Sequence, residues 1–288
     1  MILREDNTAF VVVCGIALSL AFLDFPANTR YELILLVTAV VALGLPHGAL
    51  DAWYAEDRGF SGDGWRGSLA FYLAYVSLAT VTAIAWLLFP ATSLCLFLAI
   101  SAWHFSGDWR DVLTQRERLT AGLTLVSLPA FFHPESVELL YEVLVGQQAT
   151  KIVTVQTYIA LASGTLLMIS TLRGAPKHPH LLLEISLILV CAWALAPITF
   201  FLVYFCGLHS IRHMLRLLDG VSYKVGVSAL VHCLLAVLAA LAVWKVAPAA
   251  MTIDEYLLSA VFIGLAALTV PHMLIHDVLD PAQRRGAS

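Results

Sequence analysis

Charged residues are scarce in this chain, and their scarcity excludes most kinds of protein. Only 12% of the 288 residues are Asp, Glu, Lys or Arg, whereas 60% are hydrophobic and the mean hydropathy is +0.85. A soluble domain carries about 25% charged residues. The composition therefore excludes a water-soluble globular protein and predicts a membrane protein that crosses the bilayer several times.

The chain also lacks the cysteine motifs of a zinc or redox centre. Its five cysteines lie in or beside apolar runs, and no CxxC pair occurs. Such cysteines are expected to be small buried apolar side chains. We find no low-complexity tract and no sign of a second domain, so a single integral-membrane domain over residues 1–288 is expected. The net charge is −4, and we expect no nucleic-acid partner.

Apolar runs of spanning length fill most of the chain. A membrane-spanning helix needs about 20 mostly apolar residues. Prolines between the runs mark the places where such helices end. We therefore expect an all-α transmembrane bundle of about ten spans, at residues 8–25, 30–50, 67–89, 91–107, 119–133, 153–172, 180–196, 197–217, 228–247 and 257–278.

The positions of Lys and Arg provide an independent test of this number. With ten spans, alternate loops face the same side of the membrane, and cytoplasmic loops are enriched in basic residues. Of the sixteen Lys and Arg residues, all but Arg30, Lys151 and Lys245 then fall on the side that holds the N-terminus. This bias favours ten spans, or an even number with the same pairing, and predicts that both termini are cytoplasmic in a cell (inner) membrane.

Histidines are frequent for so apolar a chain, and six of the ten gather at one expected membrane level. An imidazole buried in apolar surroundings is costly without a partner, and a metal ion satisfies several imidazoles at once. A single intramembrane histidine is more often a hydrogen-bonded structural residue, but this pattern predicts a metal site. The six lie at the cytoplasmic ends of the second, fourth, eighth and tenth expected spans: His47, His104, the pair His209 and His213, and the pair His272 and His276.

Two carboxylates accompany these motifs at helical spacing. Asp51 follows His47 by four residues, and Asp108 follows His104 by four. A histidine that binds a metal usually donates its other ring N–H to a carboxylate or carbonyl, which fixes its tautomer. We expect Asp51 and Asp108 to orient ligating imidazoles in this way; the competing interpretation is that they cap or solvate helix ends.

Aromatic residues cluster around the same motifs. Trp103, Phe105, Tyr204 and Phe205 are candidates to line an apolar space beside the metal, as a hydrophobic substrate drawn from the bilayer would require. The competing interpretation is the aromatic belt at the membrane interface, which is typical of membrane helices.

Four motifs together resemble one known family. GLPHGALD at residues 44–51, SAWHFSGD at 101–108, CGLHSIRH at 206–213 and the late PHM at 271–273 resemble the Brp/Blh family of membrane-integral β-carotene 15,15′-dioxygenases. The resemblance implies four iron ligands, which fall on His47, His104, His209 and His213, with no catalytic residue beyond them. His272 matches the late PH motif, where a supporting role outside the ligand set is expected, and no role carries over to His276.

The resemblance also implies a reaction. Fe(II) and O₂ would cleave the central C15–C15′ double bond of β-carotene to give two molecules of retinal, with a retinal-binding rhodopsin as the downstream recipient. No general base or nucleophile is needed. The protein would hold the polyene with its midpoint at the iron and keep bulk water out.

Three alternatives stay open at this point. A non-catalytic carotenoid- or retinal-handling partner of a rhodopsin, or a transporter, would bind the pigment without cleaving it. A membrane di-iron desaturase or hydroxylase commonly has HxxHH boxes, and no HH pair occurs here. A b-type haem protein would use two facing histidines and leave the others unexplained.

Overall fold

The computed structural model describes residues 5–23, 29–60, 64–174, 179–217, 223–245 and 251–279. Within these ranges the regular elements are all helices and no strand occurs, which confirms the all-α prediction. The chain divides into two compact units, each built from two separate stretches. Unit 1 comprises Met1–Leu36 and Ala91–Arg212, and unit 2 comprises Val37–Pro90 and His213–Ser288.

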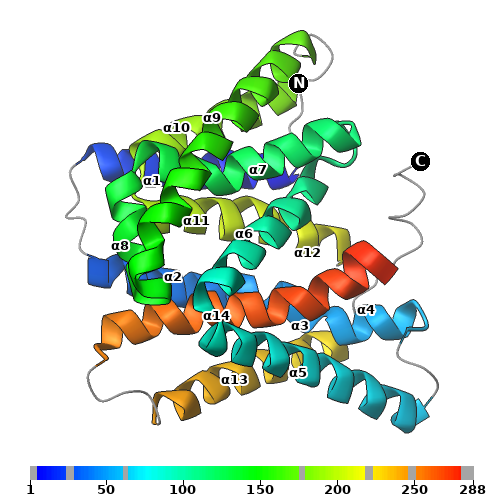
Figure 1. Ribbon diagram of the computed structural model, residues 1–288. Helices are drawn as coiled ribbons and strands as arrows, with labels where there is room; N and C mark the ends of the chain where they lie inside the picture. The colour runs from blue at the N-terminus through cyan, green and yellow to red at the C-terminus, as the bar shows by residue number, and fades with distance from the viewer. Residues whose placement is uncertain are drawn as a thin grey trace. The chain divides into compact units, whose positions relative to one another are not determined.

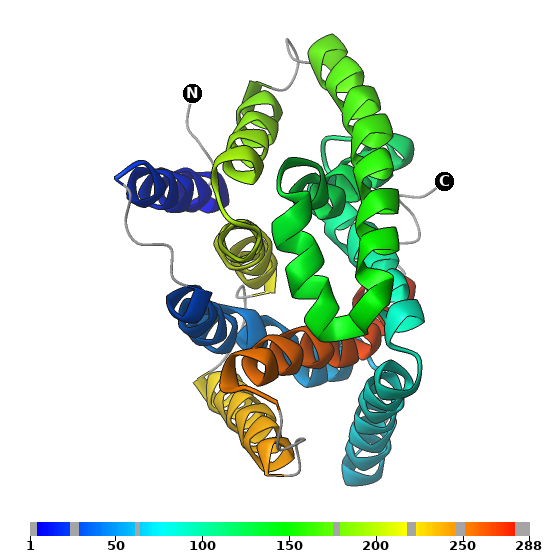
Figure 2. The ribbon, with the colours of Figure 1, turned by 60° about the vertical axis from the view of Figure 1, so that its left-hand side comes forward.

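In unit 1 the long helices α7 and α9 pack along each other, and α8 turns back against both (Figure 2). Helix α1 contacts α10, α11 and the π-helical segment η4. The elements that lie wholly or mainly in this unit are α1 (Glu5–Phe22), α2 (Thr29–Ala39), α6 (Pro90–Ser106), η2 (Gly107–Trp109), α7 (Gln115–Phe132), α8 (Pro134–Val145), η3 (Gly146–Gln148), α9 (Ala149–Gly174), α10 (Pro179–Ala194), α11 (Pro197–Tyr204) and η4 (Phe205–Ser210).

In unit 2 helix α14 packs along α5, and both α13 and α14 contact the short helix α3 (Figure 1). The elements of this unit are η1 (Val40–Gly44), α3 (Leu45–Ala49), α4 (Asp51–Asp57), α5 (Gly64–Leu88), α12 (Ile211–Leu217, which starts in unit 1), α13 (Tyr223–Trp244), α14 (Ile253–Met273) and η5 (Leu274–Leu279).

The helices have the length and composition of membrane spans. Five segments of the described chain are long and apolar enough to cross a bilayer: Gly64–Leu88, Pro134–Ser170, Pro197–Arg216, Val225–Trp244 and Ile253–Leu279. Two shorter apolar helices occupy Asn7–Phe22 and His180–Ala194. Large apolar side chains such as Leu73 and Leu238 are exposed on α5 and α13, as expected where lipid replaces water. The ten spans and the cytoplasmic termini stay predictions.

Capping boxes begin α7, which follows the motif of His104, and α14, which ends at the motif of His272. The backbone N–H and hydroxyl of Thr114 donate to the Glu117 carboxylate, while the Glu117 N–H donates back to the Thr114 hydroxyl. Thr252 and Glu255 repeat this arrangement at the start of α14. Each box satisfies N–H groups that the first helical turn leaves without partners, so these sequences define where α7 and α14 start.

Three π-helical segments occur among the described residues, and each adjoins a histidine motif. Segment η1 ends three residues before His47, η4 contains His209, and η5 contains His276. A π turn widens the helix by one residue, is rare, and is frequent at functional sites. Near two of them a proline removes a backbone donor: Pro46 follows η1 and Pro271 precedes η5.

Candidate metal centre

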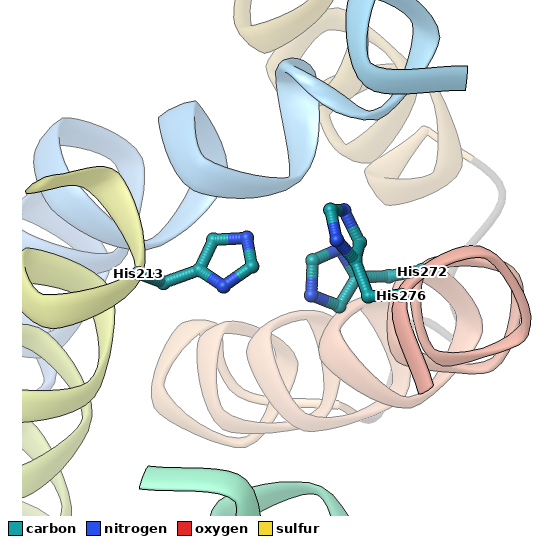
Figure 3. Close-up of side chains that lie close together, drawn as sticks. All are labelled: His213, His272 and His276. Atoms are coloured by element: carbon teal, nitrogen blue, oxygen red, sulfur yellow. The ribbon is translucent and has the colours of Figure 1, made fainter. Parts of the chain in front are cut away.

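Three buried imidazoles meet within unit 2. The possible ligand atoms of His213, His272 and His276 all lie within 4.8 Å of one another. His213 comes from α12, His272 from the last turn of α14, and His276 from η5. Segment η5 continues α14 directly, so His272 and His276 lie on successive turns of one helix. Figure 3 shows the rings of His272 and His276 side by side and facing that of His213. This cluster is the densest gathering of metal-binding groups in the part of the chain that the structure describes.

A single carboxylate, Asp51 at the start of α4, holds two of these rings. Its Oδ1 accepts from Nδ1 of His272 at 2.8 Å and from Nε2 of His276 at 3.0 Å. Its Oδ2 accepts from the Tyr75 hydroxyl at 2.9 Å. Burial raises the pKa of the Asp51 carboxyl. Attraction to His272 and the hydrogen bonds from both imidazoles lower this pKa by a larger amount, so the net pKa lies below the usual value. Only 1% of Asp51 is exposed.

Apolar packing keeps water away from the same place. The ring of Tyr54 stacks on that of His276, with centroids 4.2 Å apart. Leu50, Tyr54, Ala229 and Ile275 form a buried cluster here. In such surroundings charged and hydrogen-bonded groups interact more strongly than they do in water.

A second pair of imidazoles lies in unit 1. Nε2 of His104, on α6, is 3.2 Å from Nε2 of His209, on η4, and both rings are buried. Two nitrogens bound at about 2.1 Å to one metal ion lie roughly 3.0 Å apart when they subtend a right angle. The observed separation therefore suits two neighbouring ligands of one ion as well as it suits a hydrogen bond.

Asp108, in η2, orients this pair. Its Oδ2 accepts from Nδ1 of His209 at 3.0 Å and from the Tyr204 hydroxyl at 2.6 Å. Burial alone raises the pKa of the Asp108 carboxyl, but His209 and then Arg212 lower it, so the net pKa is below the usual value. The ionised carboxylate fixes the tautomer of His209 in which Nε2 carries the lone pair.

The buried ion pair of Arg212 and Glu184 holds the backbone of Asp108 in place. Arg212 donates to the Asp108 backbone carbonyl at 3.2 Å and to the Glu184 carboxylate at 2.7 Å. Glu184 also accepts from the Trp109 indole N–H at 2.6 Å, and the Asn7 side chain accepts from Arg212 at 2.9 Å. The segment that carries Asp108 is thus tied to α10, α12 and α1.

Comparison with known proteins identifies the family. A model of the β-carotene 15,15′-dioxygenase family matches residues 38–280, which include every histidine considered above. The chain belongs to this family. It is 29% identical to a β-carotene 15,15′-dioxygenase from an uncultured marine bacterium, 66A03, in an alignment that covers 83% of this chain and 91% of the relative. No solved structure matches it.

The four ligands that the family resemblance implies are distributed over both units. His104 and His209 lie together in unit 1, and His213 lies with His272 and His276 in unit 2. The backbone of His47 belongs to α3, but its side chain lies outside the described residues. The ligand set therefore stays a prediction.

The residues expected to support the ligands make hydrogen bonds to imidazoles. Asp108 bonds His209, which is 101 positions away, and Asp51 bonds His272 and His276, more than 200 positions away. Sequence spacing had linked these carboxylates to His104 and His47, four residues before them. Sequence reasoning also left His276 without a role, although His272 and His276 have the same four-residue spacing as His209 and His213 and that signal was available.

Three of the four aromatic residues expected to line a substrate surround His209. Phe105 meets its ring edge-on at a centroid distance of 4.8 Å, Phe205 stacks on it at 5.9 Å, and Tyr204 meets Phe105 at 5.2 Å. These three are buried, whereas 52% of Trp103 is exposed on α6. The apolar, aromatic surroundings of His209 suit a hydrophobic ligand.

The donor sets fit the ion that the family resemblance implies. Imidazole nitrogens bind ferrous iron and the other divalent transition metals well. In each unit a buried carboxylate accepts a hydrogen bond from one ring nitrogen of an imidazole, as expected for a histidine that binds metal through its other nitrogen. Neutral ligands beside an ionised carboxylate also suit a cation electrostatically.

Proposed function

We propose that this protein cleaves the central C15–C15′ double bond of β-carotene with O₂ and yields two molecules of retinal. One oxygen atom enters each new aldehyde, so O₂ is the only oxidant the reaction needs. Family membership supports the substrate and the bond. The observation in the molecule that carries the proposal is a buried His209, held at Nδ1 by Asp108 and facing His104 through Nε2, in aromatic surroundings.

The reaction depends on Fe(II), with His47, His104, His209 and His213 as the proposed ligands. Iron supplies the O₂ chemistry. The chain itself needs no general base, because no proton has to be removed from the polyene. Asp108 keeps His209 in the tautomer that presents a lone pair at Nε2.

The remaining tasks are to bind the polyene and to exclude water. Phe105, Tyr204 and Phe205 form the apolar surroundings of His209, and Trp103 offers an exposed aromatic surface on the same helix as His104. A C40 hydrocarbon dissolves in the bilayer, so lateral entry from lipid avoids a transfer through water. We place the protein in the cell membrane, where retinal can pass to a rhodopsin.

The test is expression in bacteria that accumulate β-carotene, followed by extraction for retinal and measurement of iron per chain. Loss of carotenoid colour with formation of retinal is expected. His209→Ala should abolish both retinal formation and iron retention, and Asp108→Asn should lower the rate while some iron stays bound. His133→Gln, which keeps a side chain able to reach the Ala192 carbonyl far along α10, is the matched control.

A folded, iron-loaded preparation that leaves β-carotene intact would contradict the proposed cleavage. Pigment that copurifies uncleaved would favour a carotenoid-handling protein instead. An unchanged rate in Asp108→Asn would make Asp108 a helix-end residue without a role in the reaction.

A further inference from the structure

We propose that His213, His272 and His276 together bind one divalent transition-metal ion, with Asp51 as the residue that positions two of the three rings. His272 and His276 are then direct ligands of the ion that His213 binds, although the family's four-histidine set does not include them. The proposal shares a metal requirement with the proposed function, but it rests on the geometry of unit 2 and needs no carotenoid.

The distances permit this assignment with small movements. Two nitrogens bound to one ion at about 2.1 Å are at most about 4.2 Å apart. The possible ligand atoms of the three histidines lie within 4.8 Å of one another. Three ligands of a tetrahedral ion lie about 3.4 Å apart, so a closure of about 1.4 Å at most, which side-chain rotations can supply, brings all three to one ion.

The hydrogen bonds of Asp51 determine which nitrogens can bind. The carboxylate accepts from Nδ1 of His272 and from Nε2 of His276. Each neutral ring then carries its lone pair on the other nitrogen: Nε2 in His272 and Nδ1 in His276. A neutral His213 has one such lone pair as well. A metal ion accepts all three lone pairs at once.

The charge balance points the same way. Asp51 is almost fully buried, and its second oxygen is already bonded to the Tyr75 hydroxyl. An isolated buried carboxylate is costly, and a nearby cation offsets that cost. With a metal ion bound, Asp51 behind His272 and His276 would complete the carboxylate–histidine–metal arrangement that raises ligand basicity.

The surroundings would retain the ion. His213, His272 and His276 are each less than a tenth exposed. Tyr54 stacks on His276, and Leu50 and Ile275 pack beside it. Exclusion of water slows exchange of a bound ion, and imidazole-only ligation favours iron, cobalt, nickel, copper or zinc over magnesium and calcium.

The test uses Co²⁺ as a spectroscopic probe on the purified full-length protein in detergent. Visible d–d absorption reports nitrogen ligands directly, and equilibrium dialysis gives the affinity without any assay of activity. His213→Ala, His272→Ala and His276→Ala should each weaken Co²⁺ binding by more than 100-fold and change the absorption bands. Asp51→Asn should weaken binding by about 10- to 100-fold while the bands keep their positions, because Asp51 orients ligands without binding metal.

His232→Ala is the matched control, because His232 lies in unit 2 on α13 and bonds the Ser228 carbonyl of its own helix. It should leave affinity and bands unchanged. If an alanine variant does not fold, His272→Gln and His276→Gln keep a polar side chain of similar volume and replace it.

Unchanged Co²⁺ affinity and bands in folded His272 and His276 variants would overturn the proposal and leave these residues as hydrogen-bond partners. The two proposals fail separately. Co²⁺ binding that depends on the three histidines in a protein that leaves β-carotene intact would refute only the cleavage reaction. Retinal formation with unaltered metal binding in both variants would refute only the three-histidine site.

Discussion

Two buried aspartates have closely similar partners, one in each unit. Asp51 accepts hydrogen bonds from the Tyr75 hydroxyl and two histidines, and Asp108 accepts from the Tyr204 hydroxyl and His209. A tyrosine that donates to the carboxylate satisfies one lone pair without adding charge. The negative charge therefore stays available to the imidazole, which it holds in one tautomer and one orientation.

At the residue scale, the contribution of the buried ion pair of Arg212 and Glu184 to the stability of the protein can be tested. Removing one member of a buried ion pair leaves the other charge uncompensated, at a cost of about 3–5 kcal/mol. Arg212→Met should lower the free energy of unfolding by roughly that amount, measured by Trp fluorescence in detergent. The double variant Arg212→Met with Glu184→Leu should recover part of the loss, because it removes both charges.

Arg58→Met is the control for this experiment, since Arg58 is exposed at the end of α4. A loss at Arg212 no larger than that at Arg58 would show that the pair contributes little to stability.

At the scale of elements, close contact between α6 and α7 positions His104. A Cβ atom at Gly122 on α7 would overlap the backbone carbonyl oxygen of Ala102 on α6. Backbone cannot move aside as a flexible side chain does, so α6 must shift away. His104 is two residues beyond Ala102 on the same helix and moves with it.

Gly122→Ala should therefore destabilise the protein by about 1–3 kcal/mol, the usual cost of overpacking, and lower retinal formation as well. Gly164→Ala on α9 is the matched control, because its Cβ would lie 3.7 Å from the Thr124 methyl group, an ordinary contact. Equal stability and activity in the two variants would contradict this account of how α6 is held.

At the scale of the whole molecule, the distribution of basic residues predicts the topology. With ten spans the segment before Gly64 is cytoplasmic and helix α8 faces the other side. In a Cys95→Ser background, a membrane-impermeant maleimide should label Glu138→Cys in intact cells. It should label Asp57→Cys only after the membrane has been permeabilised. The reverse labelling pattern would contradict the predicted orientation.

The sequence by itself determined the all-α class and predicted histidines as the ligands of a metal ion. These depend on local information: the length of apolar runs, prolines between them and histidines in an apolar chain. It also predicted that Asp51 and Asp108 orient imidazoles, with capping of helix ends as the competing interpretation.

Only the tertiary structure decided which imidazole each carboxylate holds. Helical spacing pairs Asp108 with His104 and Asp51 with His47, since residues four apart share a face. In the folded chain Asp108 bonds His209, and Asp51 bonds His272 and His276. Those pairings depend on which helices pack together, and the periodicity of a single helix carries no information about its neighbours. The three-histidine cluster of unit 2 became visible for the same reason, when packing brought α12 and the end of α14 together.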